Sequence, residues 1–286
     1  MIKNKNLNTP ITIDCNSKLL DLSTPAIMGI LNLTDDSFYD GGQHNSIKKA
    51  LLQTEKMLDD GAKIIDIGAY SSRPMAKHIS LNEEWRRLEK TLQIINKEFP
   101  QAIVSVDTFR SEIARRSVDN GADLINDISA GNLDLEMFDT VAELHVPYII
   151  MHMQGTPQSM QDNPHYNCIE KEVVNYFYVK IKTLQQKGVN NIIIDPGFGF
   201  GKTLEHNYQL LNNLEELHTL EHPLLVGISR KSMIYKVLET DAKNSLNGTT
   251  AIHSLCLSKG ASILRVHDVK EAVECVKLIN FAKNQL

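Results

Sequence analysis

The sequence lacks several features that would place the protein in common functional classes. Its four cysteines are widely spaced and form no Cys-x-x-Cys pair, so neither a zinc site nor a disulfide framework is indicated. No run approaches the roughly 18 apolar residues of a membrane span, and the opening segment MIKNKNLNTP lacks the apolar stretch of a signal peptide. We therefore expect a cytoplasmic protein that does not enter a membrane.

The net charge and the lack of common catalytic motifs exclude further functional classes. The formal net charge is -5, which offers no large basic surface for nucleic acid. The chain contains no Gly-x-Ser-x-Gly nucleophile elbow, no His-Glu-x-x-His and no close Cys/His pair. We expect small molecules as partners.

No Pro/Ser-rich linker or low-complexity segment interrupts the 286 residues, of which 42% are apolar. This composition fills a large core, so we expect one domain over residues 1–286. Residues 1–24 are expected to form an N-terminal extension, because residues 11–22 alternate around Asn16 and Ser17 like a small hairpin. Such a hairpin would cover one end of the domain.

Eight short Ile/Val-rich runs are present instead, and each ends in a polar or charged residue. Each is strand-sized and is followed by a segment of helical length, which is typical of βα units. Eight such units predict a closed (β/α)8 TIM barrel, whose chemistry lies at the C-terminal ends of the strands. The runs end at or near Asn32, Asp66, Asp107, Asn126 with Asp127, His152, Asp195, Ser229, and Arg265 with His267.

Helical patterns separate the runs, and a short extra helix is expected near Ser229 or Arg230. Asn82 and Asp268 are the expected N-caps of two of these helices. The patterns cover about 46–60, 82–98, 110–120, 134–144, 169–188, 204–217, 244–259 and 268–284.

The connections after the first two runs, residues 33–46 and 69–80, are polar and longer than ordinary βα turns. Long loops at the catalytic end of a barrel usually act as lids, so we expect both to be mobile and to cover a site. A passive surface excursion is the alternative.

The glycine-rich segment from Asp195 to Thr203 superficially resembles a phosphate loop. Three residues separate Gly197 from Gly201-Lys202, however, where a Walker A loop needs four. The glycines also give Gly-x-Gly-x-Gly and not the dinucleotide pattern Gly-x-Gly-x-x-Gly. We therefore expect a tight turn that holds Asp195 at a strand end, with no nucleotide bound there.

Three of the strand-end residues, Asp107, Asn126 and Asp195, are mostly hydrogen-bond acceptors that the barrel would point into one cavity. Such a group suits a flat heterocycle with an amidine-like N–H edge; a helix N-cap is the alternative for any one of them. A second group of residues expected at this end of the barrel is cationic and suits an anionic substrate such as a diphosphate. It comprises Lys231, Arg265 and His267, with Arg73 in the second long loop.

One of the residues that end the apolar runs, His152, has two open interpretations. It lies between Met151 and Met153 at a strand end, where it would serve as a general base or as a buried structural residue.

Taken together, the motifs resemble the dihydropteroate synthase family over almost the whole barrel. That family has a TIM-barrel fold, in agreement with the strand count. The matching segments are MGILNLTDDSFYDGG (28–42), DIGAYSSRP (66–74), SVDTF (105–109), LINDISAG (124–131), MHMQGTPQSMQ (151–161), DPGFGFGKT (195–203), LLVGISRKSMI (224–234) and RVHDV (265–269).

The resemblance implies condensation of 6-hydroxymethyl-7,8-dihydropterin diphosphate with p-aminobenzoate in folate synthesis, Mg²⁺ as cofactor and a homodimer joined through the last helices. It also implies a role for each matching residue. Pterin contacts would come from Asp107, Asn126, Asp195 and Lys231, with Asp66 and Met151 nearby; diphosphate contacts from Arg265, His267 and Asn32, the last also binding Mg²⁺; and aminobenzoate contacts from Phe38, Ser72, Arg73, Pro74, Phe200 and Ser229. Asp107, Asp195, Lys231, Arg265 and His267 would be the catalytic residues.

Three loop positions depart from the common family pattern. Asp35 stands where proline is usual, Tyr70 where glutamate is common, and Met75 where glycine is common. Two alternative functions remain: a pterin-dependent methyltransferase barrel, which would not need the Ser-Arg-Lys or Arg-x-His motifs, and a non-catalytic pterin- or anion-binding barrel.

Overall fold

The computed structural model describes residues 12–33, 42–71 and 78–285, and the side chains of 42–46 are outside that description. Within these residues, eight parallel strands alternate with helices, as the sequence predicts for a (β/α)8 barrel. The strands are β3 (Ala26–Asn32), β4 (Ile64–Gly68), β5 (Ile103–Asp107), β6 (Leu124–Asp127), β7 (Tyr148–Met151), β8 (Ile192–Asp195), β9 (Leu225–Val226) and β10 (Ile263–Val266).

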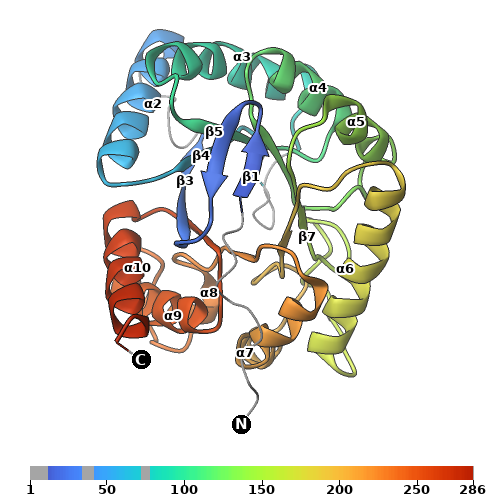
Figure 1. Ribbon diagram of the computed structural model, residues 1–286, viewed down its shortest axis with the longest axis vertical. Helices are drawn as coiled ribbons and strands as arrows, with labels where there is room; N and C mark the ends of the chain where they lie inside the picture. Colours follow the sequence, from blue (N-terminus) through green and yellow to red (C-terminus); the bar gives the residue numbers. More distant parts are fainter. Residues whose placement is uncertain (1–11, 34–41, 72–77, 286) are drawn as a thin grey trace.

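The strands are hydrogen-bonded in the order β8-β7-β6-β5-β4-β3-β10-β9. A parallel bridge between Ile194 and Leu224 joins the two ends of this sheet and completes the ring. Figure 1 shows the helices arranged around the strands, with the C-terminus on the outer ring. The helices are α2 (Gly42–Asp59), α3 (Leu81–Glu98), α4 (Ser111–Asp119), α5 (Met137–Leu144), α6 (Ile169–Gln186), α7 (Leu204–Asn212), the 3-10 helix η1 (Leu214–Leu220), α8 (Ser232–Tyr235), α9 (Leu246–Ser258) and α10 (Val269–Lys283).

The predicted N-terminal hairpin is present as β1 (Thr12–Cys15) and β2 (Lys18–Asp21). Its two turn residues have positive φ, 51° at Asn16 and 71° at Ser17, as tight hairpin turns require. The hairpin places Ile13, Cys15, Leu20 and Leu22 against the first inward-facing residue of the barrel strands. It therefore seals the N-terminal end of the barrel with apolar side chains (Figure 1).

Side chains alternate between the inside of the barrel and the helical layer, because successive residues of a strand point to opposite faces. In β4, Ile64 belongs to the apolar layer inside the barrel, whereas Ile65 and Ile67 pack in the larger core under the helices. The next inward position after Ile64 is Asp66, which is fully buried. The barrel interior thus changes from apolar to polar along β4.

The predicted helices are confirmed with corrections at their ends, except that the one predicted over 204–217 is divided at Asn213 into α7 and the 3-10 helix η1. Helix α3 begins at Leu81, and its N-cap is Ser80, whose Oγ accepts a 3.2 Å hydrogen bond from the Glu83 N–H; the prediction of Asn82 was wrong because a hydroxyl two residues earlier makes that bond. Asp268 does precede the last helix, but its carboxylate pairs with Arg230 at 2.7 Å and makes no capping bond. The extra helix α8 also begins after Ser229 and Arg230. None of the described helices is long and apolar enough to span a membrane.

Helix α9 buries an imidazole without a partner. His253 is 1% exposed, and neither ring nitrogen has a hydrogen-bond partner among the residues that the structure describes. Burial lowers its pKa to about 4, although the Asp268 carboxylate opposes the shift. An unfolded chain binds a proton on this ring near pH 6.5, but the folded chain does not until about pH 4. The free energy of unfolding therefore falls as the pH drops from 6.5 towards 4.

We predict that His253→Leu raises the free energy of unfolding by about 1 kcal/mol at pH 7, because it removes a buried polar group without a partner. The gain should grow by about 2 kcal/mol at pH 5, where the unfolded wild-type chain is protonated. Urea unfolding at both pH values measures this, with the exposed His165→Leu variant as control. An equal effect at both pH values would contradict the assignment.

Candidate active site

The inward-facing residues at the C-terminal half of the barrel form a polar layer. They come from four strands: Asp66 from β4, Ser105 and Asp107 from β5, Asn126 from β6 and Arg265 from β10. Although Asp66 and Arg265 lie 199 residues apart in the sequence, their side chains are in direct contact. The alternation of the strands, set by the apolar residues above and below, brings these groups together.

Asp66 is the centre of this layer. One of its oxygens, Oδ1, accepts a 2.6 Å hydrogen bond from the Ser105 hydroxyl. The other, Oδ2, accepts from Arg265 Nε at 2.6 Å and from Asn126 Nδ2 at 3.2 Å. This bond uses one of the two N–H groups of the Asn126 amide, so its second N–H and its amide oxygen remain for a ligand. Asp66 thus orients two of its neighbours.

Asp107 lies at the end of β5 and accepts a 2.8 Å bond from Arg265 Nη2. Burial raises the pKa of Asp107 to about 7, with the neighbouring Asp66 adding to the shift and Arg265 opposing it. The guanidinium of Arg265 is also buried, which opposes its charge, but the carboxylates of Asp66 and Asp107 outweigh burial and raise its pKa. Arg265 therefore stays charged while it is shared between two acids.

Asp195, at the end of β8, is 6% exposed and is held by its own turn. Its Oδ1 accepts a 2.8 Å hydrogen bond from the Gly197 N–H. Burial raises its pKa, and the charges of Lys231, Arg265 and Lys202 limit the rise. A carboxylate faced by several cations remains available as an ionised acceptor.

Lys231 precedes α8 and reaches back to the same turn. Its Nζ donates to the Phe198 carbonyl at 2.5 Å and lies 4.6 Å from the centroid of the Phe200 ring. Burial lowers its pKa to about 8, although Asp195 opposes the shift. Both Lys231 Nζ and Asp195 Oδ2 flank Gly227, where a Cβ would lie 3.9 Å and 3.8 Å from them. The absence of a side chain at Gly227 leaves space between these two groups.

Three further predicted residues line the same end of the barrel. Ser229 lies three residues beyond β9, so the prediction that it ends this strand was wrong. Its Oγ is 3.1 Å from His267 Nδ1 and accepts a 3.2 Å hydrogen bond from the His267 N–H. Asn32 ends β3 across from Asp107: a Cβ at Gly68 would lie 3.7 Å from Asn32 Oδ1 and 3.7 Å from Asp107 Oδ2. Ser229 and His267 therefore form a pair, and Asn32 faces the carboxylate layer.

An apolar wall adjoins the polar layer. Met151 ends β7 facing inward and packs with three buried residues of the loops, Ile128, Met153 and Met160. The ring of Phe200 lies against this cluster. Flexible thioethers and an aromatic ring make a surface suited to the face of a flat ligand.

The question left open for His152 is answered by its side of the strand. Since Met151 points inward, His152 points outward, where its ring contacts Tyr176 edge-on at 4.9 Å between centroids. Its Nδ1 is 2.9 Å from Lys202 Nζ. Burial lowers the pKa of His152 to about 2, and the charge of Lys202 adds to this. His152 is therefore a neutral structural residue outside the barrel, not a base inside it. Asp127 also points outward, and it accepts a 2.6 Å bond from the Tyr148 hydroxyl.

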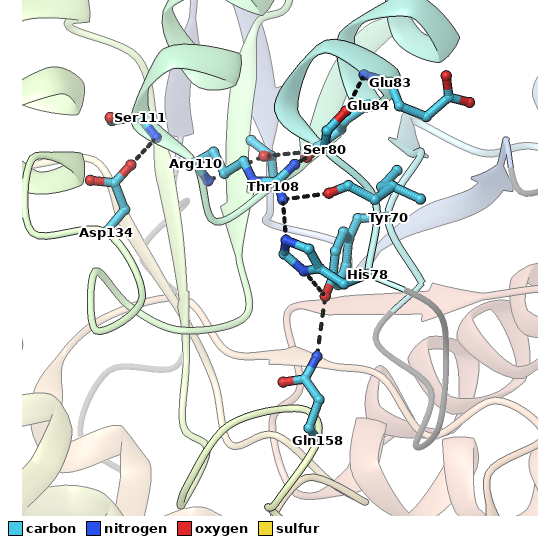
Figure 2. A network of polar contacts seen from close by, with 11 residues as sticks. Tyr70, His78, Ser80, Glu83, Glu84, Thr108, Arg110, Ser111, Asp134 and Gln158 are labelled. Carbon is cyan, nitrogen blue, oxygen red and sulfur yellow. Dashed lines mark hydrogen bonds and ion pairs between the residues drawn. The ribbon is translucent and has the colours of Figure 1, made fainter.

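A polar network at the rim was not anticipated from the sequence. Figure 2 shows His78 between two partners: its Nδ1 is 3.1 Å from the Tyr70 hydroxyl, and its Nε2 is 3.3 Å from Arg110 Nη2. Arg110 also pairs with the buried carboxylate of Glu84, and Gln158 Nε2 donates to the Tyr70 hydroxyl at 3.2 Å. The network connects the loops after β4, β5 and β7. Tyr70, at a position where glutamate is common, makes two of these contacts.

Several predicted residues lie outside the described part of the chain. They are Phe38, Ser72, Arg73 and Pro74, together with the departures Asp35 and Met75.

Two buried residues that support the site were not predicted, Ser105 and Lys202. Ser105 has a signal in the sequence, because it lies two residues before Asp107 on the same strand and so faces the same side. Lys202 has no such signal: its position after three glycines suggests an exposed loop, whereas it is 3% exposed.

Comparison with known proteins agrees with this geometry. Residues 28–267 match the family described as pterin binding enzyme. The dihydropteroate synthase of Escherichia coli K12 is 44% identical over 262 residues, which cover 91% of this chain and 92% of that protein.

Two solved structures have the same fold. The dihydropteroate synthase of Yersinia pestis, solved with a sulfonamide drug, superposes with a TM-score of 0.90 at 40% identity, covering 96% of this chain and 100% of that one. The enzyme of Xanthomonas albilineans in complex with 7,8-dihydropteroate gives 0.86 at 34% identity, covering 96% and 99%. With a matching family model, this identity and this coverage, the chain belongs to the dihydropteroate synthase family of pterin-binding enzymes.

Proposed function

We propose that the polar inner layer of the barrel is the catalytic centre of this dihydropteroate synthase, a transferase of folate synthesis. There it joins 6-hydroxymethyl-7,8-dihydropterin diphosphate to p-aminobenzoate, releasing diphosphate and 7,8-dihydropteroate. The observation that carries the proposal is the convergence of three acceptors with two half-buried cations at one end of the barrel. The acceptors are Asp107, Asn126 and Asp195, and the cations are Lys231 and Arg265.

The pterin ring would lie across the mouth of the barrel. Its amidine-like N–H edge would donate to Asp107, Asn126 and Asp195, and its carbonyl and ring nitrogens would accept from Lys231. Met151 would cover one face of the ring from the apolar wall. Asp66 would act behind this layer by holding Asn126 and Arg265 in place.

The reaction begins when the bond between the pterin methylene carbon and the diphosphate oxygen breaks. The electron pair leaves with diphosphate, and positive charge spreads from the methylene carbon into the pterin ring. Carboxylates fixed beside the ring stabilise that charge without having to reorganise, which lowers the barrier. Asp107 and Asp195 are placed for this work. The amine of aminobenzoate then forms the new C–N bond and loses a proton, so no protein nucleophile is needed.

The departing diphosphate would be held by the cationic side of the site. Arg265 and His267 come from the end of β10 and the residue after it, and Asn32 faces them from β3. The described residues contain no cluster of three or more acidic, His or Cys side chains for a metal. One amide oxygen still fits Mg²⁺, which commonly takes one or two protein oxygens plus substrate phosphates. Asn32 would hold it, and the ion would neutralise charge on the diphosphate.

The aminobenzoate would bind beside the diphosphate. Phe200, on the turn after β8, and Ser229, ahead of α8 and 3.1 Å from His267, would line this subsite. Phe38, Ser72, Arg73 and Pro74 from the two long loops would complete this subsite by their match to the family motifs. The two alternative functions, a methyltransferase barrel and a non-catalytic barrel, are not favoured by the relatives, which are dihydropteroate synthases.

We further propose that the protein is a homodimer joined through its last helices. Helices α9 and α10 expose Leu255, Leu278 and Phe281, which are 38%, 71% and 70% accessible. We expect that Leu278→Asp with Phe281→Asp converts the dimer to a monomer, because two charges cannot be buried unpaired in an interface. Sedimentation velocity measures the change, with Leu135→Asp, an exposed leucine (87%) before α5, as control. A wild-type monomer would refute the proposal.

Replacing the acceptors or the lysine tests the site directly. Asp195→Asn and Lys231→Met are each expected to lower kcat/KM for the pterin diphosphate about 10²- to 10³-fold, as loss of an electrostatic stabiliser does. The melting temperature should change little, because each variant is close in size to the wild-type residue. Release of diphosphate from the purified enzyme, with aminobenzoate and Mg²⁺ supplied, is the assay. Normal turnover in either variant would remove that residue from the mechanism.

The ionisation of the site predicts a narrow pH optimum. Asp107 must be ionised to accept from the pterin, and its pKa is raised to about 7, so kcat/KM should fall below that pH. Lys231 must be protonated to donate, and its pKa is lowered to about 8, so kcat/KM should fall above it. The acid limb should be lost in Asp107→Asn, at a lower rate throughout. A plateau extending from pH 5 to pH 10 in the wild type is incompatible with these roles.

A further inference from the structure

We propose that Lys202 is a positioning residue for the pterin site. From behind the glycine-rich turn after β8, its ammonium group fixes the turn that carries Asp195 and that Lys231 contacts from the cavity side. The inference rests on the proposed pterin contacts of Asp195 and Lys231. Lys202 itself touches no substrate, because it lies outside the barrel among protein acceptors.

The contacts of Lys202 converge on one nitrogen. Nζ donates to the carbonyls of Gly197 at 2.9 Å, Phe200 at 3.0 Å and His152 at 3.3 Å. It also lies 2.9 Å from the Nδ1 of the neutral His152 ring. Because an ammonium group only donates, Nδ1 is the unprotonated ring nitrogen and accepts, and the three N–H groups are shared among four acceptors. The single ammonium group thus ties two carbonyls of the turn to the end of β7. His152 supplies the anchor on the β7 side, which gives this histidine a function.

The backbone of the turn packs so closely on the β7 loop that its glycine positions have no room for a side chain that could donate to these carbonyls. Gly197 has φ 68°, and a Cβ there would lie 2.0 Å from the His152 carbonyl oxygen. Gly201 has φ 57°, and a Cβ there would lie 2.6 Å from the Gln154 oxygen. The backbone of the turn therefore packs directly on the β7 loop, and its carbonyls need a donor that arrives from outside the turn. Lys202 is that donor.

The opposite side of the turn belongs to the site. Lys231 Nζ donates to the carbonyl of Phe198, whose fully buried ring anchors the middle of the turn. The Gly197 N–H holds Asp195 Oδ1. Lys202 and Lys231 thus grip one short backbone segment from two sides, so a shift of the turn moves both pterin contacts together.

The charge of Lys202 argues for more than packing. A buried ammonium is costly, and within the described residues no carboxylate lies within ion-pair distance of it. Burial lowers its pKa to about 7, and the charge of Asp195 opposes the shift. In return, Lys202 is one of the cations that limit the pKa rise of Asp195. The positive charge behind the turn therefore favours the ionised acceptor in front of it.

Lys202→Met removes the ammonium and keeps most of the side-chain volume. We expect the Kd for 6-hydroxymethylpterin, which cannot react, to rise at least tenfold, while the Kd for inorganic diphosphate with Mg²⁺ stays within twofold. Titration calorimetry on the full-length enzyme measures both. A purely structural lysine would lower the melting temperature and the active fraction, but it would not separate these two affinities.

Lys18→Met is the matched control. Lys18 is a partly buried lysine that also donates to a carbonyl, that of Ala102 at 2.7 Å, and it pairs with Asp123 at 2.8 Å beside the N-terminal hairpin. Its removal changes the net charge equally, at the other end of the barrel. We expect it to leave both affinities within twofold. Pterin affinity that falls equally in Lys18→Met and Lys202→Met would overturn the proposal.

His152→Phe serves if Lys202→Met does not fold, because the ring keeps its contact with Tyr176 and Lys202 keeps its charge. Loss of the Nδ1 acceptor should raise the pterin Kd two- to fivefold and leave diphosphate binding unchanged. Unchanged pterin binding in the folded variants of Lys202 and His152 refutes the positioning role. Asp195→Asn separates the two levels: if it too binds pterin normally, the proposed pterin site is at fault; if it alone loses pterin, only the role of Lys202 fails.

Discussion

The contact between Arg265 and Asp66 is the interaction on which the site depends. It joins the last strand of the barrel to the second, at 2.6 Å, inside a ring that has an apolar layer below it. An ion pair whose carboxylate is fully buried is weak evidence for stability, because desolvating the charges costs about as much as their attraction returns. Its value lies in geometry: Asp66 also holds Ser105 and Asn126, and Arg265 also holds Asp107.

The two ends of the barrel divide stability from chemistry. At the N-terminal end, the hairpin and the first inward residues, such as Ile64 and Ile263, exclude water with apolar side chains only. One inward position further along, the same strands carry Asp66 and Arg265. The apolar layer at the N-terminal end keeps the strands in register. The polar layer above it, whose burial costs free energy, therefore does not have to set the register. A one-residue slip in any strand would turn its acid or arginine outward into the helical layer.

This division also explains how far the sequence predicts the structure. Eight polar-ended apolar runs were sufficient for the barrel and for the meeting of Asp107, Asn126 and Asp195 at one end. Period-two alternation, applied strictly, also separates Asn126 from Asp127 and Met151 from His152, since neighbours on a strand face opposite ways. The rim network of Tyr70, His78, Arg110 and Gln158 was not predictable, because side chains from three loops meet there and no repeat encodes their relative positions. The N-cap of α3 was assigned to Asn82 and not to Ser80 because both residue types are favoured at that position.

The glycine-rich turn after β8 is the segment where residue types alone suggest the wrong function, that of a phosphate-binding loop. A lysine after a run of glycines suggests a cation presented to a phosphate, yet Lys202 points away from the cavity and donates to the backbone of its own turn. The glycines supply close contact with the β7 loop, and the Gly197 N–H donates to the Asp195 carboxylate of the same turn. What reaches the cavity is Asp195, an acceptor. The same few residues that would bind an anion in another geometry would therefore, in the proposed function, present a carboxylate to the pterin, because the lysine is on the protein side of the turn.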